Sequence, residues 1–476
     1  MGEPIRFDFG TSSDPDRYGP NSGPRHWNAY VEAVDDGKMA LPIHADDGFI
    51  RFSDATGLGN IRALPVVLDD QIYALLGAEV IRIDSLGNRV SVGGIAGTAR
   101  AIMARNDKAT TPQIVVVVDD GTRFVVENNA VSSIADVDLP APNSCTFLNR
   151  HIVFGISDGR FFWSAVDEAT SISALDFAEA EGNPDGCVRI IAHLQELWVF
   201  GTESTEVWYD DGVSFVRRGS TVIPKGAIGK HTIAELDMDL FWVGNDNVVY
   251  AARGYAFERI SNHAVEQSIR ETTDKNDIIG WSYFRDGSAF YVLSGPDWTW
   301  RFNRTLSRKL GKPVWTERYS YDSGGRWKAE YAVQFKNEWI IGNNSDDGLY
   351  KLSADAYDED GDYLVWKLRS APLHAYPKQI CIDRLHLDFV TGVGRVSSDT
   401  HLSDPQVGLR WSDDGGRTWS NQIFRSLGAS GQYQTRVTFD GLGMTGRTGR
   451  ILDLEISSPV VRSLMYAAIE GDPAGT

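Results

Sequence analysis

Cysteine is scarce in this sequence: only Cys145, Cys187 and Cys381 occur in 476 residues, and they stand far apart. An odd number cannot form a complete disulfide framework, and the sequence has no CxxC pair that would indicate a metal or redox site. We therefore expect buried, reduced thiols, as is typical of cysteine in a reducing compartment.

Long apolar segments are also missing. The first residues, MGEPIRFDFGTSSD, contain no apolar core of a secretory signal, and the longest strongly apolar run, 114–118, is far too short to span a bilayer. The sequence therefore predicts a protein without a membrane anchor that is made and kept soluble in a reducing compartment.

Positive charge is in deficit, with 46 lysine and arginine residues against 65 aspartate and glutamate residues and a formal net charge of -19. Proteins that read a nucleic-acid sequence carry a basic patch or stripe, and proteins of the membrane surface carry polybasic segments. The composition argues against both classes. It is compatible with a protein that contacts DNA without binding it tightly.

Catalytic motifs are missing as well. The nine histidines are scattered, with no HExxH pair, and the sequence contains neither a GxSxG elbow nor a P-loop. The stretch 441–446 spells GxGxxG, but residues 447–456 alternate like a strand where a dinucleotide site needs a helix. The sequence therefore predicts no enzymatic activity and no cofactor.

One acidic segment invites comparison with a calcium-binding loop. Asp358, Asp360 and Asp362 occupy the first, third and fifth positions of such a loop. Its sixth and twelfth positions hold Tyr363 and Arg369 instead of glycine and a carboxylate. We interpret the segment as a solvated turn and predict no metal site; weak binding of a divalent cation is the alternative.

The sequence does contain a β-strand repeat. Short β-branched and aromatic runs end in glycine and lead into a second strand that carries an aromatic residue, whereas helical periodicity is rare. The repeat glycines stand at positions 77, 121, 155, 201, 244, 295 and 342, with spacings of 44, 34, 46, 43, 51 and 47 residues. A period near 45 is typical of the four-stranded blades of a β-propeller.

We predict an all-β protein built around this β-propeller. Six blades are favoured and seven are possible, because the last strand of a propeller often completes the first blade; an irregular β-sandwich is the alternative fold. The glycines are expected to supply the positive φ of tight hairpins. Two segments interrupt the repeat: 261–272 is predicted to be a short surface helix with Ala264, Val265 and Ile269 on one face, and 167–180 a helix or loop.

Shifts in composition divide the chain into three segments. Residues 1–50 are rich in glycine, proline, aspartate and asparagine, and we interpret them as an extended N-terminal arm that needs a neighbour to become ordered. Residues 51–353 form the predicted propeller, and residues 354–476 form a C-terminal β-domain. Deletion of residues 1–45 is expected to weaken assembly with other chains while leaving the propeller folded.

The sharpest local motif lies in the C-terminal β-domain and matches the Asp-box pattern SxDxGxTW at every fixed position. Its residues are Ser412, Asp414, Gly416, Thr418 and Trp419. Asp414 can accept hydrogen bonds from backbone amides, Gly416 permits the turn, and Trp419 packs the hairpin onto its sheet. We interpret the motif as a structural hairpin. Because it resembles the Asp boxes of sialidases, a glycan-binding or sialidase-like propeller is the alternative, and a protein-interaction propeller is a third.

Four stretches resemble the packaged-DNA stabilisation proteins, the tail-hub or nozzle family of short-tailed bacteriophages. They are FFWS at 161–164 with 174–181; ELWVFG at 196–201 with 205–209 and 215–218; FWVG at 241–244 with 249–250, 254–255, 259–261 and 264–266; and LRWSDDGGRTW at 409–419 with 425–428, 437–443 and 455–459. Together they cover most of the chain. The N-terminal segment is only loosely similar, through Asn28, Tyr30 and Glu32.

The resemblance implies a structural protein of the virion, in the phage tail, that assembles in the host cytoplasm as a homo-oligomeric ring, with a hexamer expected. Its implied partners are the portal-adaptor protein, tail fibres or spikes, a needle or plug protein, and double-stranded DNA that passes through the channel without sequence-specific binding. The family has no catalytic residues to carry over. An acidic channel wall would repel phosphate and let DNA slide, which would give the net charge of -19 a role.

Overall fold

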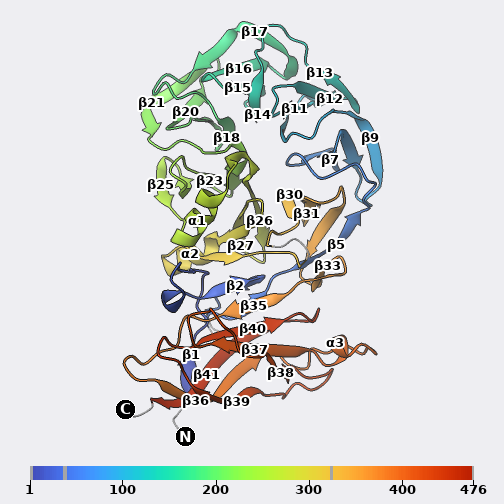
Figure 1. Ribbon diagram of the computed structural model, residues 1–476. Helices are drawn as coiled ribbons and strands as arrows, with labels where there is room; N and C mark the ends of the chain where they lie inside the picture. The colour runs from blue at the N-terminus through green and yellow to red at the C-terminus, as the bar shows by residue number, and fades with distance from the viewer. Residues whose placement is uncertain (1–3, 36–39, 322–324, 474–476) are drawn as a thin grey trace.

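The computed structural model describes residues 4–35, 40–321 and 325–473. Figure 1 shows two β-rich units, a large propeller and, next to the chain termini, a C-terminal sandwich. Among the described residues, no helix combines the length and the apolar character needed to span a membrane. The predicted all-β fold, a propeller with a separate C-terminal β-domain, is confirmed.

The described part of the propeller consists of seven four-stranded antiparallel blades, of which five are separate sheets and two are parts of larger sheets. Blades one to four contain β6 (Val66–Leu68), β7 (Gln71–Leu76), β8 (Glu79–Ile83) and β9 (Arg89–Gly94); β10 (Ala101–Arg105), β11 (Ile114–Val118), β12 (Arg123–Glu127) and β13 (Ala130–Ser133); β14 (Pro142–Leu148), β15 (His151–Ile156), β16 (Arg160–Ala165) and β17 (Glu168–Glu179); and β18 (Arg189–His193), β19 (Glu196–Phe200), β20 (Thr205–Asp210) and β21 (Phe215–Ile223).

Blades five to seven contain β22 (Ala234–Leu236), β23 (Asp239–Val243), β24 (Val249–Arg253) and β25 (Ala256–Arg259); β26 (Ile279–Arg285), β27 (Ser288–Ser294), β28 (Thr299–Asn303) and β29 (Trp315–Glu317); and β30 (Ala329–Phe335), β31 (Glu338–Asn343), β32 (Leu349–Ser353) and β5 (Gly48–Ser53). The first strands of most neighbouring blades contact one another, so these strands surround the propeller axis.

The preference for six blades was wrong, and seven is the number in the described residues. Each repeat glycine lies in or just after the second strand of one blade, so the repeat count equals the blade count. The strand that closes the ring is β5, which comes from before the repeat and pairs antiparallel with β32. Closure therefore adds an outer strand to the last blade and leaves the first blade complete in itself.

The predicted role of the repeat glycines holds at two positions. Gly77 and Gly121 have φ values of +53° and +86°, whereas the other five lie outside the left-handed region. At Gly295, a Cβ atom would lie 2.3 Å from the indole of Trp298. Most of these glycines are therefore required because a side chain packs against their backbone.

One of the two predicted interruptions of the repeat is confirmed. The three apolar residues of the predicted helix are buried in α1 (His263–Glu271), and the Asn262 side chain accepts a hydrogen bond from the Val265 amide (3.0 Å) as its N-cap. The segment 167–180 is neither helix nor loop, because most of it forms β17. This outer strand is half exposed and bulged, so its sequence lacks a clear alternation. The other helices are α2 (Arg304–Leu310) and α3 (Thr400–Ser403), with short 3-10 turns at Gly19–Asn21, Lys230–Thr232 and Lys275–Asp277.

The C-terminal unit is a sandwich of two sheets whose apolar faces share one core. One sheet contains β1 (Ile5–Phe7), β3 (Ala29–Val31), β4 (Ile43–Ala45), β36 (Ile380–Phe389), β39 (Val437–Met444) and β41 (Ser463–Pro473). The other continues blade six through β2 (Arg25–Trp27), β35 (Trp366–Arg369), β40 (Ile451–Ile456), β37 (Gln406–Ser412) and β38 (Ile423–Ser426). A short hairpin of β33 (Asp358–Glu359) and β34 (Asp362–Tyr363) extends blade seven.

The N-terminal segment is not an arm that needs another chain, so this interpretation is corrected. Its described strands pair with the chain's own sheets: β1 and β4 pair with β41, and β2 lies between β29 of the propeller and β35 of the sandwich. Strands of three residues are too short to show periodicity, which is why the sequence suggested an arm. Removal of residues 1–45 would take β1 to β4 out of both sheets of the sandwich, so an assembly defect of that truncation would not report on contacts between chains.

Asn28 fastens the propeller to the sandwich. This residue is fully buried and has a φ of +50°, and its backbone N–H donates to the carbonyl oxygen of Glu317 (2.9 Å). Its Nδ2 donates to the carbonyl oxygens of Tyr319 (3.0 Å) and Val365 (2.9 Å), and its Oδ1 accepts from the Tyr319 amide (3.1 Å). One side chain thus bonds both units and fixes how they meet.

Candidate functional site

The five residues of the predicted Asp box come together in the turn after β37. Ser412 Oγ donates to Asp414 Oδ1 (2.8 Å). The Asp414 carboxylate accepts from the backbone amides of Arg417 and Thr418 (both 2.9 Å) and from Thr418 Oγ1 (2.6 Å). These hydrogen bonds, that of the Thr418 hydroxyl above all, lower the pKa of Asp414. Gly416 has a φ of +90°, so the turn has the geometry that the motif predicts.

Trp419 completes the box and connects it to two arginines. Its Nε1 donates to the carbonyl oxygen of Gly416 (3.2 Å). The guanidinium groups of Arg369 and Arg410 lie 4.5 and 5.0 Å from the centre of its ring. Both arginines donate to Asp453 Oδ2, at 2.9 and 3.1 Å, and the Asp453 side chain is only 1% exposed. The predicted box is therefore one end of a larger contact.

The same contact reaches the N-terminal segment through Trp27. Arg25, Arg369 and Lys367 lie 4.3, 5.1 and 5.5 Å from the centre of its ring. We call the set the tryptophan–arginine ladder: Trp27, Trp419, Arg25, Lys367, Arg369 and Arg410. Sequence reasoning missed it because its members come from separate strands. One signal was available, since Trp27 is the only tryptophan before residue 160.

The ladder is a structural contact and not an open anion site. Its cations pair with Asp453, Glu317 and Glu455, and their charged groups cover the indole rings. A sialidase-like site needs arginines that are free to bind a substrate carboxylate. The ladder therefore gives the glycan-cleaving alternative no support.

Replacement of Trp419 by alanine is expected to destabilise the sandwich by roughly 1–2 kcal/mol, because it removes two cation–π contacts and the cover of the Asp-box turn. Phe424→Ala on β38 is the matched control, since Phe424 is 52% exposed and its loss should change little. Urea unfolding followed by circular dichroism measures both variants. Equal midpoints for Trp419→Ala, the control and the wild-type protein would contradict a structural role for the motif.

The acidic segment 358–362 forms the β33–β34 hairpin. Asp360 accepts from Arg51 Nε (2.9 Å), and Asp362 accepts from Lys328 Nζ (2.5 Å). Across the described ranges, no group of three or more histidine, cysteine, aspartate or glutamate side chains is placed to hold a metal ion. Two of the three aspartates are thus engaged with cations, and the alternative of a divalent-cation site gains no support.

The cysteines carry free thiols. Cys145 and Cys187 are buried, and Cys381 is half-buried. Burial raises the pKa of Cys145 and of Cys187 to about 12, so both thiols stay protonated. The prediction of buried thiols is correct for these two and wrong for Cys381, which lies on β36 at the margin of the sandwich.

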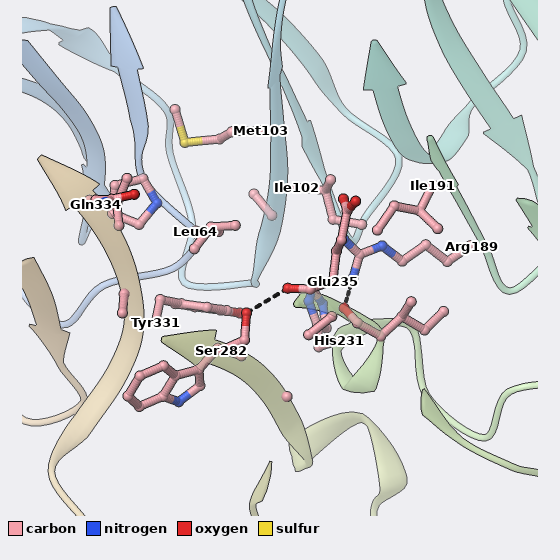
Figure 2. A pocket seen from close by; sticks show the side chains of 18 of the residues that line it. Leu64, Ile102, Met103, Arg189, Ile191, His231, Glu235, Ser282, Tyr331 and Gln334 are labelled. Carbon is pink, nitrogen blue, oxygen red and sulfur yellow. Dashed lines mark hydrogen bonds between the residues drawn. The ribbon is translucent and has the colours of Figure 1, made fainter. Parts of the chain in front are cut away.

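A cavity of about 430 Å³ lies on the propeller axis between the first strands of the blades. Figure 2 shows its polar side chains approaching one space from different blades: Arg189 begins β18, His231 precedes β22, and Tyr331 lies in β30. Sequence reasoning did not predict this cavity, because its lining comes from strands that are far apart in the chain.

The polar groups of this cavity form no catalytic pair. His231 Nε2 lies 2.8 Å from Asp119 Oδ2, and burial lowers the pKa of His231, so a neutral imidazole donates to Asp119. Ser282 Oγ donates to the carbonyl oxygen of Glu235 (2.6 Å) and to no histidine. The lining therefore offers shape and charge but not the hydrogen-bonded nucleophile and base of acyl or glycosyl transfer.

Two solved structures match the chain at low similarity. A virginiamycin B lyase from Staphylococcus aureus is 10% identical, with a TM-score of 0.43 and coverage of 63% of this chain and 98% of that chain. BamB from Moraxella catarrhalis is 12% identical, with a TM-score of 0.41 and coverage of 74% of this chain and 96% of that chain. Similarities at this level carry no argument about function. No curated protein sequence matches the chain.

Two family models match the chain in the order of its two units. The model described as bacteriophage P22 Gp10, beta-propeller, matches residues 53–357, and the model described as bacteriophage P22 Gp10, beta-sandwich, matches residues 365–469. Together they cover most of the sequence, and they confirm the resemblance that the sequence motifs indicated. The chain therefore belongs to the bacteriophage P22 Gp10 family, the DNA-stabilisation proteins of the phage tail, which are virion structural proteins that retain packaged DNA.

Proposed function

We propose that the chain assembles into a ring, with six copies expected, below the portal-adaptor ring of a short-tailed phage. The observation that carries this proposal is the match of both family models, which places both units of the chain in one tail-protein family. The ring would continue the DNA channel, help to retain packaged DNA, and anchor tail fibres or spikes and a needle or plug protein. The role is structural and not catalytic, and assembly takes place in the host cytoplasm.

The rigid connection between the two units supports a role under mechanical load. Strand β2 belongs to the sheet that runs from blade six into the sandwich, and Asn28 bonds both units. The tryptophan–arginine ladder adds contacts between this strand and the sandwich. A channel component that holds DNA in place has to resist force, and a body joined at several points suits that task.

The acidic composition supports a channel that does not bind DNA tightly. Each chain carries a formal charge of -19, so copies arranged around DNA would repel its phosphates more than they attract them. In a mobility-shift assay with double-stranded DNA, the purified protein is therefore expected to show no binding. Tight binding, or a channel wall found to be basic in the assembled ring, would contradict this part of the proposal.

Ring formation is the central test of the proposed function. The purified full-length chain, mixed with its portal-adaptor ring, is expected to form a complex with six copies per adaptor ring, measured by mass photometry. Particles assembled without the chain are expected to lose most of their packaged DNA, measured as nuclease-protected DNA. A chain that stays monomeric with and without the adaptor ring would contradict the proposal.

A further inference from the structure

The axial cavity has a polar end that the structural role does not use. Arg189 begins β18, His231 stands just before β22, and Tyr331 is the third residue of β30, so all three lie toward the same end of the inner strands. Tyr331 has a φ of +60° at a β-bulge, and its side chain is 5% exposed. Its hydroxyl lies near the guanidinium of Arg100 but forms no hydrogen bond of ordinary geometry among the described residues, so its own proton has no acceptor there. An unpartnered donor in a cavity wall indicates a place for an acceptor.

Arg189 has unused hydrogen-bonding capacity at the same end. Its Nη1 donates to the carbonyl oxygens of Lys230 (2.8 Å) and Ile233 (3.1 Å). Within the described ranges, Nε and Nη2 have no acceptor. Burial lowers the pKa of Arg189, but a guanidinium stays charged in proteins. Two of its three nitrogens are therefore available to an anion or left unsatisfied.

Both signs of charge occur around this cavity. Its own lining includes Arg189, Glu235 and Asp237, and Glu235 pairs with His193 (2.9 Å). Arg100, Arg326, Lys230, Glu330 and Asp119 stand near the polar end. Arg100 and Arg326 share the single carboxylate of Glu330. Arg189 forms no ion pair within the described part of the chain. Because charge acts more strongly in a narrow cavity than in water, the guanidinium of Arg189, which has no ion pair there, attracts an anion even in a chain with a net charge of -19.

The remaining walls of the cavity are largely apolar. They include Leu64, Ile102, Met103, Ile191, Trp281 and Val333. A volume of about 430 Å³ is within the range of sites for small ligands. A free inorganic anion would leave these walls uncovered, whereas an apolar body with one charged end would match both the walls and the polar end.

We propose that the axial cavity binds an apolar group that ends in a single carboxylate, with the carboxylate at Arg189 and next to Tyr331. Nη1 of Arg189 is already bonded to two carbonyl oxygens, so only its other two nitrogens can bind the ligand. One carboxylate is enough to accept from both of them. Two sources supply this chemistry: the C-terminal residue of a partner chain, if its side chain is apolar, and a free medium-chain carboxylic acid. This inference adds a ligand site to the propeller and does not depend on the ring.

Titration calorimetry on the full-length chain tests the proposal with matched probes. Octanoate is compared with octanamide, and the N-acetylated tripeptide alanyl-alanyl-leucine with a free C-terminal carboxylate is compared with its amide. At least one of the acids is expected to bind roughly tenfold more tightly than its neutral counterpart. Binding of the peptide acid alone assigns the site to a partner chain, and binding of octanoate alone assigns it to a free acid. Equal affinity within both pairs, or no binding of any probe, would overturn the proposal.

Three variants locate the site. Arg189→Met is expected to remove the preference for the acid. Tyr331→Phe removes a hydroxyl whose proton has no acceptor in the free protein, so the variant should unfold at a nearly unchanged midpoint and bind the acid roughly three- to tenfold more weakly. Ser282→Ala is the control, because its hydroxyl is bonded to a backbone carbonyl and not to the ligand. A Tyr331→Phe variant that unfolds earlier and binds unchanged would show a purely structural hydroxyl and overturn the assignment.

Discussion

Replacement of Asp46 by asparagine is expected to lower the free energy of unfolding by roughly 3–5 kcal/mol, because it leaves buried positive charges without their partner. The Asp46 side chain is 0% exposed and contacts Arg301, with Arg318 at 3.0 Å and Arg285 at 4.0 Å. Burial raises the pKa of Asp46, but Arg301 and Arg318 outweigh this effect and hold it below the usual value. The Asp46 carboxylate is therefore charged at neutral pH and balances the buried charges of Arg301 and Arg318.

Asp46 belongs to a buried set of charges between the propeller and the sandwich, which we call the junction network. Its members are Asp46, Asp47, Arg285, Arg301, Arg318 and Glu359. Arg301 also donates to the carbonyl oxygen of Ala29 (3.2 Å) and to Thr316 Oγ1 (3.0 Å), which ties the N-terminal segment to blade six. Without the carboxylate of Asp46, Arg301 would retain only neutral partners, so its buried charge would be uncompensated.

Asp286→Asn is the matched control for this prediction. Asp286 also pairs with an arginine of the junction network, Arg285 at 3.5 Å, but its side chain is 68% exposed. Exposed ion pairs contribute little, so the control should lose less than about 1 kcal/mol. Urea unfolding at neutral pH, followed by circular dichroism, measures both variants. If Asp46→Asn unfolds at the wild-type midpoint, the junction network does not hold the two units together.

The repeat and the Asp box could be predicted from the sequence because both are local patterns. One glycine per blade marks the second strand, and the spacing near 45 residues counts the blades once the closing strand is known to come from residues 48–53. The motif from Ser412 to Trp419 contains the donors and acceptors of its own turn. Patterns of this kind predict local structure even when the tertiary contacts are unknown.

The junction could not be predicted because its contacts join distant parts of the chain. Asp46 and Arg301 are 255 residues apart, and Asn28 bonds a residue 337 positions away. In the sequence, Asp46 and Asn28 stand in a glycine- and proline-rich segment that is typical of loops. Periodicity reports which face of a strand is buried, but not which charged side chains meet. The axial cavity was missed for the same reason, since Arg189 and Tyr331 come from different blades.

Glu359 is a second buried carboxylate of the junction network, and its protonation behaves differently from that of Asp46. Its side chain is 0% exposed, accepts a hydrogen bond from Trp327 Nε1 (2.8 Å), and lies 3.8 Å from Arg318. Burial raises the pKa of Glu359 to about 7, against the opposing effects of Arg318 and of hydrogen bonds from Ser320 and Trp327. The folded protein therefore holds a proton here that the unfolded chain releases at lower pH.

Glu359→Gln is therefore expected to flatten the dependence of stability on pH. In the wild-type protein, the stabilisation from protonated Glu359 is complete below the unfolded pKa of 4.5 and is lost as the pH rises through about 7, a fall of roughly 3 kcal/mol. Glutamine keeps an acceptor for Trp327 and does not ionise, so the variant should match the wild-type protein near the acid end and exceed its stability above the folded pKa. Asp47, whose pKa burial raises to about 6, keeps a smaller fall of the same sign in the variant. Urea midpoints measured across this pH range test the prediction, with Glu338→Gln as the exposed control. If the midpoints of Glu359→Gln change with pH in parallel to those of the wild-type protein, Glu359 is already ionised in the folded junction.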